Sequence, residues 1–164
     1  MFIEVNRIPP EGLEIDRALE LQPIALGGGD SAPVEKVRLT GSFRRSRGDV
    51  VFRGTVEASL SLICSRCAAP MALPVSGGCH RIYRMGALGR PASEREIDEE
   101  DLALTPFDGV RIDLAEMARE QIYLLLPLKP LCRESCAGLC ARCGANRNLG
   151  PCGCPPETPG ERNP

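Results

Sequence analysis

The chain has 164 residues, enough for one domain of ordinary size with a small appendage, and contains no Trp, two Tyr and four Phe. Its core must therefore be built from aliphatic side chains, and extensive aromatic platforms for nucleic-acid bases are not expected. The net charge is only −2, and no stretch reaches the roughly 18 uninterrupted apolar residues of a membrane-spanning helix, so we expect no contact with a membrane.

The charged residues are unevenly distributed along the sequence. Residues 36–95 contain eleven Lys and Arg against three acidic residues, whereas residues 96–120 contain nine acidic residues against two Arg. This asymmetry permits a basic face for phosphate contacts. It equally permits two solvated faces that neutralise each other across the fold.

The cysteines and the start of the sequence indicate the compartment. The nine cysteines occur mostly in closely spaced pairs, and residues 1–17 lack a basic region followed by an apolar run. This combination favours metal-bound thiolates over disulfides, so we expect a cytoplasmic protein.

The first half of the sequence predicts β-strands. Phe2–Val5 alternates as a short strand before two prolines, and residues 27–33 are expected to form a flexible turn or loop. From Val34 onward, apolar residues recur at every second position and are interrupted by the turn-forming sequence Arg47-Gly48-Asp49. This pattern predicts a β-hairpin.

Further strands are predicted after this hairpin. A strand over residues 54–63 leads into Cys64-Ser65-Arg66-Cys67, and residues 71–75 are expected to return as a strand, which places this cysteine pair at a hairpin tip. Residues 80–83 predict another strand that ends near Gly86. The polar segment Gly89–Asp101 is expected to be a weakly ordered surface excursion.

One principal helix is predicted before the end of the chain. Asp113 followed by Glu116 is typical of a capping box, and an apolar stripe follows and ends before Pro127. The stripe consists of Leu114, Ala118, Ile122 and Leu125. The predicted fold class is therefore α+β: an antiparallel β-rich body over residues 1–131 with one principal C-terminal helix at about 113–125, then a small cysteine-rich zinc knuckle over 132–154 and a disordered tail over 155–164.

The knuckle segment cannot fold by hydrophobic burial alone. Its six cysteines, in the pattern Cys132-x3-Cys136-x3-Cys140-x2-Cys143-x8-Cys152-x-Cys154, stand beside only three large apolar residues, Leu131, Leu139 and Leu149. Ordering about 20 residues costs on the order of 1–2 kcal/mol each, and three leucines return about 1.5–3 kcal/mol apiece. A structural Zn²⁺ contributes roughly 10–16 kcal/mol and a disulfide only about 2–4 kcal/mol, so we predict a metal site.

The spacing predicts which cysteines share an ion. In Cys140-Ala141-Arg142-Cys143-Gly144 two thiolates converge, and the glycine accommodates a positive φ. Cys152-Gly153-Cys154 supplies a second pair, so the first site is assigned to Cys140, Cys143, Cys152 and Cys154. Cys132 and Cys136 either replace members of this set or join Cys64 and Cys67 in a second site, which leaves one or two Zn²⁺ ions open.

Catalytic interpretations of these residues are weaker. A redox role for Cys64 and Cys67 requires the pair at a helix N-terminus, whereas a predicted strand precedes it. Cys79 has no partner at a suitable spacing and is expected to be a small buried residue, and the single histidine, His80, is expected to be structural. The sequence lacks metalloprotease, serine-hydrolase and nucleotide-binding motifs, so we predict no enzymatic activity and no small-molecule substrate.

Three motifs occur in a characteristic order: Cys64-Ser65-Arg66-Cys67 at a strand end, Ile112-Asp113-Leu114 leading to Leu124-Leu125-Leu126-Pro127-Leu128, and the tail with Cys136-Ala137-Gly138-Leu139-Cys140 and Cys143-Gly144-Ala145-Asn146. This order resembles the YceD family of bacterial and plastid proteins linked to accumulation of large-subunit ribosomal RNA. The resemblance covers roughly Val34–Cys154. The chain departs from the family at two positions. Ala68 stands where a leucine is common, and Asn146-Arg147-Asn148 stands where the family often has Asn-Leu-Asn.

The resemblance implies a non-enzymatic factor that supports accumulation, processing or stability of large-subunit (23S) ribosomal RNA and ribosome assembly. Its partner would be the ribosomal RNA precursor or a large-subunit ribosomal protein. Family members differ in whether the cysteine tail is present, so the shared function would rest on the β-rich body. For this chain we hypothesise phosphate contacts by six arginines: Arg44, Arg45, Arg47, Arg66, Arg81 and Arg84.

Two alternatives stay open at this point. The first is a protein-binding adaptor whose knuckle or acidic segment Glu96–Asp101 docks a ribosomal protein, because acidic segments attract basic proteins as readily as arginines attract RNA. The second is a thiol redox protein that uses the Cys64 and Cys67 pair.

Overall fold

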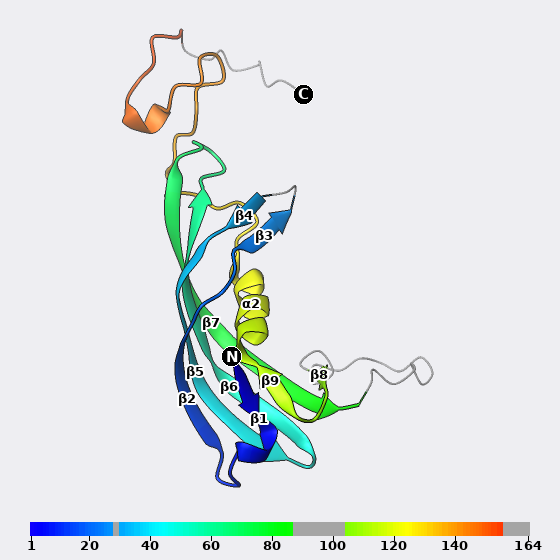
Figure 1. Ribbon diagram of the computed structural model, residues 1–164. Helices are drawn as coiled ribbons and strands as arrows, with labels where there is room; N and C mark the ends of the chain where they lie inside the picture. Colours follow the sequence, from blue (N-terminus) through cyan, green and yellow to red (C-terminus); the bar gives the residue numbers. More distant parts are fainter. Residues whose placement is uncertain (28–29, 87–103, 156–164) are drawn as a thin grey trace. The chain divides into compact units, whose positions relative to one another are not determined.

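The computed structural model describes residues 1–27, 30–86 and 104–155 (Figure 1). The chain divides into two compact units: unit 1 comprises Met1–Ser61 and Ala72–Leu126, and unit 2 comprises Leu62–Met71 and Pro127–Pro164. The sequence prediction divides the chain at residue 131, whereas the C-terminal segment of unit 2 begins at Pro127 and unit 2 also includes Leu62–Met71. The predicted surface excursion at 89–101 and the predicted tail from 156 onward lie outside the described residues.

A five-stranded sheet runs through unit 1 with strand order β2-β5-β6-β7-β8. The bounds are β2 Leu13–Leu19, β5 Val34–Ser46, β6 Asp49–Ile63, β7 Pro70–Met85 and β8 Leu104–Phe107. β5 pairs antiparallel with both β2 and β6, whereas β8 pairs parallel with β7. The sheet is therefore mixed, and the predicted antiparallel arrangement does not extend to this edge.

Two smaller strand pairs complete the β structure. β1 (Phe2–Glu4) pairs with β9 (Arg111–Asp113), and the 3₁₀-helix η1 (Val5–Arg7) follows β1. β3 (Ile24–Gly27) pairs with β4 (Asp30–Ala32). The segment 27–33, predicted as a loop, thus contains a short strand, because backbone pairing with β3 overrides the weak strand propensity of Asp and Ser.

The α-helix α2 (Leu114–Leu125) lies along one face of the sheet (Figure 1). Its start is fixed by Asp113, whose Oδ1 accepts hydrogen bonds from the amides of Ala115 at 2.8 Å and Glu116 at 3.4 Å. The helix buries the side chains of Leu114, Met117, Ala118, Gln121 and Ile122. In the part of the chain that the structure describes, no helix is long and apolar enough to cross a membrane.

β7 is one long strand where the sequence predicts two. The prediction places a break between residues 75 and 80, but the strand continues through Gly77 and Gly78. A Cβ at position 77 would lie 2.4 Å from Leu125 Cδ2, so glycine at this point makes room for the end of α2. This glycine therefore marks a packing contact rather than a turn.

Candidate metal centres

Eight cysteines gather in two groups of four within unit 2, and in each group all Sγ atoms lie within 4.8 Å of one another. The hairpin cluster consists of Cys64, Cys67, Cys132 and Cys136. The tail cluster consists of Cys140, Cys143, Cys152 and Cys154. The tail cluster is the set assigned from the spacing, and of the two alternatives left open for Cys132 and Cys136 the structure places them with Cys64 and Cys67.

The geometry of the hairpin cluster suits a tetrahedral metal ion. The Sγ atoms of Cys64 and Cys136 are 3.8 Å apart, and those of Cys67 and Cys132 are 3.7 Å apart. Four thiolates arranged tetrahedrally around Zn²⁺ at about 2.3 Å have sulfur–sulfur separations of about 3.8 Å. These two separations match that value, and the other sulfur–sulfur separations in the cluster are at most 4.8 Å, so the residues present fit Zn²⁺.

Both clusters are built on the same backbone turn. In each turn the carbonyl of the first cysteine accepts a hydrogen bond from the amide of the residue four positions later. The Ala68 amide donates to Cys64 O at 3.0 Å, and the Gly144 amide donates to Cys140 O at 2.8 Å. The residue that donates has a positive φ in both turns, 53° at Ala68 and 71° at Gly144. The hairpin tip after β6 is thus a knuckle of the same geometry as the one in the tail, although alanine occupies its left-handed position.

Hydrogen bonds from backbone amides favour the thiolate form in both clusters. The amide of Cys132 donates to Cys64 Sγ at 3.3 Å and lowers the pKa of Cys64 to about 6. The amide of Cys143 similarly lowers the pKa of Cys140 to about 6. Cys132 is exposed as a residue, but desolvation of its thiol raises its pKa to about 12, and the Cys143 side chain raises the pKa of Cys154 to about 12. Each cluster therefore pairs a readily ionised thiol with one that ionises only when a cation offsets its neighbours.

Asn148 connects the backbone of the tail to the hairpin cluster. Its Nδ2 donates to Cys136 Sγ at 3.4 Å, which lowers the pKa of Cys136, and to Asn146 Oδ1 at 2.7 Å. Its Oδ1 accepts from the Ala137 amide at 2.9 Å and from Arg133 Nη2 at 2.8 Å. The sequence shows Asn146 and Asn148 as part of a family motif but gives them no role, because spacing along the chain does not show which sulfur an amide will reach.

Arg66, predicted to contact phosphate, also has a local role. Its Nη1 donates to the carbonyls of Glu134 at 3.4 Å and Cys136 at 3.3 Å, and its own carbonyl accepts from the Leu139 amide at 3.1 Å. These bonds join the hairpin tip to the loop that carries Cys136. The side chain is exposed, but its guanidinium is already engaged within unit 2.

The remaining cysteine and the histidine lie outside both clusters. Cys79 is buried in β7, as expected for a small core residue, and burial raises its pKa to about 11. His80 follows it and is exposed.

The arginines of the β5–β6 hairpin form an exposed cationic group in unit 1. Arg44 and Arg45 lie near the end of β5, and Arg47 lies in the turn that leads to β6. We call these three residues the hairpin arginines. All three are exposed, and because successive strand residues point to opposite faces of a sheet, Arg44 lies on the face opposite to Arg45.

The two arginines of β7 are placed differently. Arg84 donates to the Asp49 carboxylate, through Nε to Oδ1 at 3.0 Å and through Nη2 to Oδ2 at 2.7 Å. The Arg81 side chain is only 15% exposed and forms an ion pair with Glu120 on α2 at 3.3 Å. The structure therefore favours the hairpin arginines over Arg81 as phosphate contacts.

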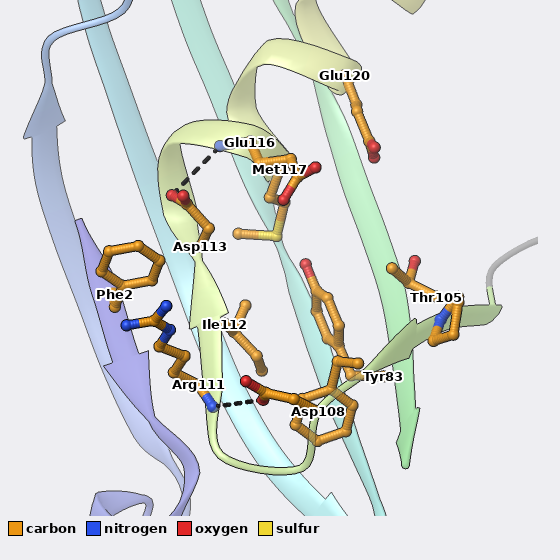
Figure 2. Close-up of a pocket in the computed structure, with 12 residues that line it drawn as sticks. Phe2, Tyr83, Thr105, Asp108, Arg111, Ile112, Asp113, Glu116, Met117 and Glu120 are labelled. Atoms are coloured by element: carbon orange, nitrogen blue, oxygen red, sulfur yellow. Dashed lines mark hydrogen bonds between the residues drawn. The ribbon is translucent and has the colours of Figure 1, made fainter. Parts of the chain in front are cut away.

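A pocket of about 490 Å³ in unit 1 has acidic walls, and no sequence motif points to it. Figure 2 shows Glu116 and Glu120 extending from α2, with Asp108 across the pocket and the Tyr83 ring between them. Asp108 accepts from the amides of Val110 and Arg111, and these bonds lower its pKa. The four carboxylates that line the pocket are Asp108, Asp113, Glu116 and Glu120.

Comparison with known proteins places the chain in a family. The profile of a family described as "Large ribosomal RNA subunit accumulation protein YceD" matches residues 52–163. The chain belongs to the YceD family. The match includes all eight clustered cysteines and excludes the hairpin arginines.

Relatives of this YceD protein occur in bacteria and plants. A protein of Mycobacterium leprae is 32% identical over 99 residues, which cover 60% of this chain and 43% of the relative. The chloroplastic YCED homolog 1 of Zea mays is 26% identical over 161 residues, which cover 81% of this chain and 55% of the relative. The chain spans about half the length of these curated relatives. No solved structure matches it.

Proposed function

We propose that this YceD protein is a non-enzymatic factor that supports accumulation of large-subunit ribosomal RNA, and that two structural Zn²⁺ ions hold its unit 2 together. The family description supports the link to ribosomal RNA. The observation that carries the structural part is the pair of closed four-cysteine clusters. Sites with four protein ligands leave no open position for substrate, so their role is architectural.

The donor set favours zinc over other metals. Four thiolates in tetrahedral arrangement select Zn²⁺ or iron–sulfur centres, whereas Mg²⁺ and Ca²⁺ require oxygen ligands. A thiol redox role is disfavoured because Cys64 and Cys67 follow a strand, and because each is surrounded by further thiols of the same cluster.

Metal analysis tests the structural part. Protein purified without chelator is expected to carry two zinc ions per chain, and Cys67→Ser or Cys143→Ser is expected to carry one. Cys79→Ala, outside both clusters, is the matched control and should retain two. A wild-type stoichiometry below one, or bound iron with its visible absorption, would contradict the assignment.

The RNA contact is proposed for the hairpin arginines rather than for unit 2. The described residues of unit 2 carry five basic side chains and one acidic side chain. Each zinc ion with four thiolates has a formal charge of about −2, so the two centres together offset that net positive charge. The hairpin arginines have no such compensation from a metal centre and are exposed.

Filter binding with a fragment of large-subunit ribosomal RNA tests this contact. Replacing Arg44, Arg45 and Arg47 together with Ser should weaken binding and reduce the slope of log K against log salt by about 0.7–0.9 for each phosphate that the protein no longer neutralises. Arg17→Ser, exposed on β2, is the control and should leave the affinity and the slope close to the wild-type values. Unchanged affinity and slope in the triple variant would exclude this surface.

A protein-binding adaptor is the second candidate, and the acidic pocket of Figure 2 favours it. Its four carboxylates outnumber the cations beside them, which are Arg111 in the pocket wall and Arg81 in the ion pair with Glu120, and this excess of negative charge suits a basic extension of a ribosomal protein. The acidic segment Glu96–Asp101, which the sequence suggested for the same purpose, lies outside the described residues. Cross-linking in cell extract separates the two functions, because the direct neighbour is either ribosomal RNA or a ribosomal protein.

A further inference from the structure

A pocket of about 360 Å³ lies beside the hairpin arginines in unit 1. Its walls come from the β5–β6 turn, the end of β7 and the turn that joins β8 to β9. This volume falls within the range of roughly 300–1,000 Å³ that is typical of sites for small organic groups. It is separate from both cysteine clusters, because every residue that lines it belongs to unit 1.

Two apolar side chains give the pocket a surface for a planar ring. Met85 lines it and is 70% exposed, although it is apolar. Gly109 has a φ of 79°, and a Cβ there would lie 2.5 Å from Met85 Sδ, so the β8–β9 turn approaches the thioether this closely only because residue 109 is glycine. Phe107 is held by an edge contact with Tyr83, with 5.9 Å between ring centroids. A thioether beside a fixed aromatic ring is a surface on which a nucleobase can stack.

The charges around the pocket select an anionic ligand. Arg45 and Arg47 line it and are exposed. Asp49 is the one carboxylate among the described lining residues, and its charge is offset by the paired hydrogen bonds from Arg84. A ligand that combines a planar aromatic group with phosphates complements both the apolar surface and the arginines.

We propose that this pocket receives an unstacked base of single-stranded RNA, whose flanking phosphates contact Arg45 and Arg47. This inference rests on the proposed RNA contact and adds the class of RNA and the side chains that select it. Bases within a duplex stay stacked and do not enter such a pocket, whereas loops, bulges and ends present theirs. The protein is therefore directed to unpaired segments of ribosomal RNA.

Fluorescence-anisotropy titration with the full chain tests the proposal. The probes are a single-stranded RNA of about 12 nucleotides and a duplex of the same length. The wild type should bind the single strand at least about tenfold more tightly, and Met85→Ala and Phe107→Ala should each remove most of that preference while leaving the salt slope unchanged. Val110→Ala, 63% exposed and outside the pocket lining, is the matched control and should bind as the wild type does.

The outcomes separate this inference from the proposed function. Equal binding of duplex and single strand, or an unchanged Met85→Ala variant, overturns the base pocket while the hairpin arginines keep their role. Equally tight binding of a free nucleoside monophosphate also overturns it, since the site would then serve a small molecule. Absence of binding to any RNA overturns the proposed function as well. Phe107→Ala can lower stability, but Met85 is exposed, so its variant remains informative.

Discussion

Arg47 occupies a backbone conformation that arginine rarely adopts. It has a φ of 51° and precedes Gly48 with a φ of 93°, so both central residues of the β5–β6 turn are left-handed, as a type I′ turn requires. Asn-Gly is the preferred sequence there, and a left-handed conformation costs most other residues about 1–2 kcal/mol. An arginine at this position therefore lowers the stability of the hairpin while placing a cation beside the RNA pocket.

Substitution of Arg47 separates stability from binding. Arg47→Asn is expected to raise the free energy of unfolding by up to about 1 kcal/mol and to weaken RNA binding, whereas Arg47→Lys keeps the charge and should keep most of the affinity. Urea unfolding and filter binding measure the two effects. If Arg47→Asn binds RNA as tightly as the wild type does, the unfavourable backbone conformation of Arg47 does not serve RNA binding.

Asn148 donates a hydrogen bond to one of the sulfur atoms of the hairpin cluster. Asn148→Ala removes the hydrogen bond to Cys136 Sγ and leaves the Ala137 amide without its acceptor. Removing a side chain that hydrogen-bonds to a metal ligand typically weakens metal binding about 10–100-fold. In competition with a chromophoric chelator, Asn148→Ala should therefore release one zinc ion early and the other as the wild type does. Asn6→Ala in η1 is the control, and both of its zinc ions should be released as in the wild type. Simultaneous release of both ions would contradict a role confined to the hairpin cluster.

At the residue scale, the sequence predicts which cysteines gather better than it predicts the residues that hydrogen-bond to them. Three cysteine pairs are local signals: Cys64 with Cys67, Cys140 with Cys143, and Cys152 with Cys154. Two cysteines separated by one or two residues can bind one ion whatever the rest of the fold is. The contacts of Arg66 and Asn148 join segments far apart in the chain, so no local pattern announces them.

The long hairpin of β5 and β6 depends on a pair of facing glycines. Gly41 and Gly54 are opposite each other, and a Cβ at Gly54 would lie 2.1 Å from Thr40 O and 2.6 Å from Phe52 Cζ. Gly54→Ala is therefore expected to lower the free energy of unfolding by about 1–3 kcal/mol through overpacking. Gly78→Ala, where no atom lies within 4 Å, is the control and should stay within about 0.5 kcal/mol. Equal effects of the two substitutions in urea unfolding would refute the steric argument.

The ion pair of Asp49 on β6 with Arg84 on β7 is expected to make the stability depend on pH. The hydrogen bonds from Arg84 lower the pKa of Asp49 below its ordinary value of 3.8. Because the folded-state pKa is lowered, the contribution to stability is complete above 3.8 and is lost as the pH falls through the folded-state value. Asp49→Asn should thus be less stable than the wild type near neutral pH, and the difference in Tm should shrink in acid. A difference that stays constant across this range would mean that the carboxylate charge contributes nothing.

At the element scale, the hairpin and the helix follow from the sequence, whereas strand pairing does not. Period-two alternation around Arg47-Gly48 and the cap at Asp113 are local features, and both elements form where predicted. The sequence does not predict β2, β3, β8 or β9. β8 has four residues and pairs in parallel with β7, so its existence depends on a partner that its own sequence does not reveal.

For the whole molecule, the division into two units means that one chain is stabilised by two kinds of interaction: apolar burial in unit 1 and, as proposed, metal coordination in unit 2. Unit 1 has a conventional core that includes Phe43, Phe52 and Leu39. In unit 2 the buried side chains are mostly cysteines, while Leu128 and Leu149 are fully or largely exposed at 101% and 88%. Stability should therefore depend on metal in unit 2 and on apolar burial in unit 1.

Removal of metal is thus expected to unfold one unit and spare the other. With a strong chelator, amides of residues 62–71 and 127–155 should exchange with deuterium within seconds, while those of β5 and α2 keep their protection. Re-addition of zinc should restore protection in unit 2, because binding energy and folding energy are the same quantity for such a segment. Protection of residues 127–155 that survives chelation would mean that something other than thiolate coordination orders them. Loss of protection throughout would mean that the sheet, too, depends on the ions.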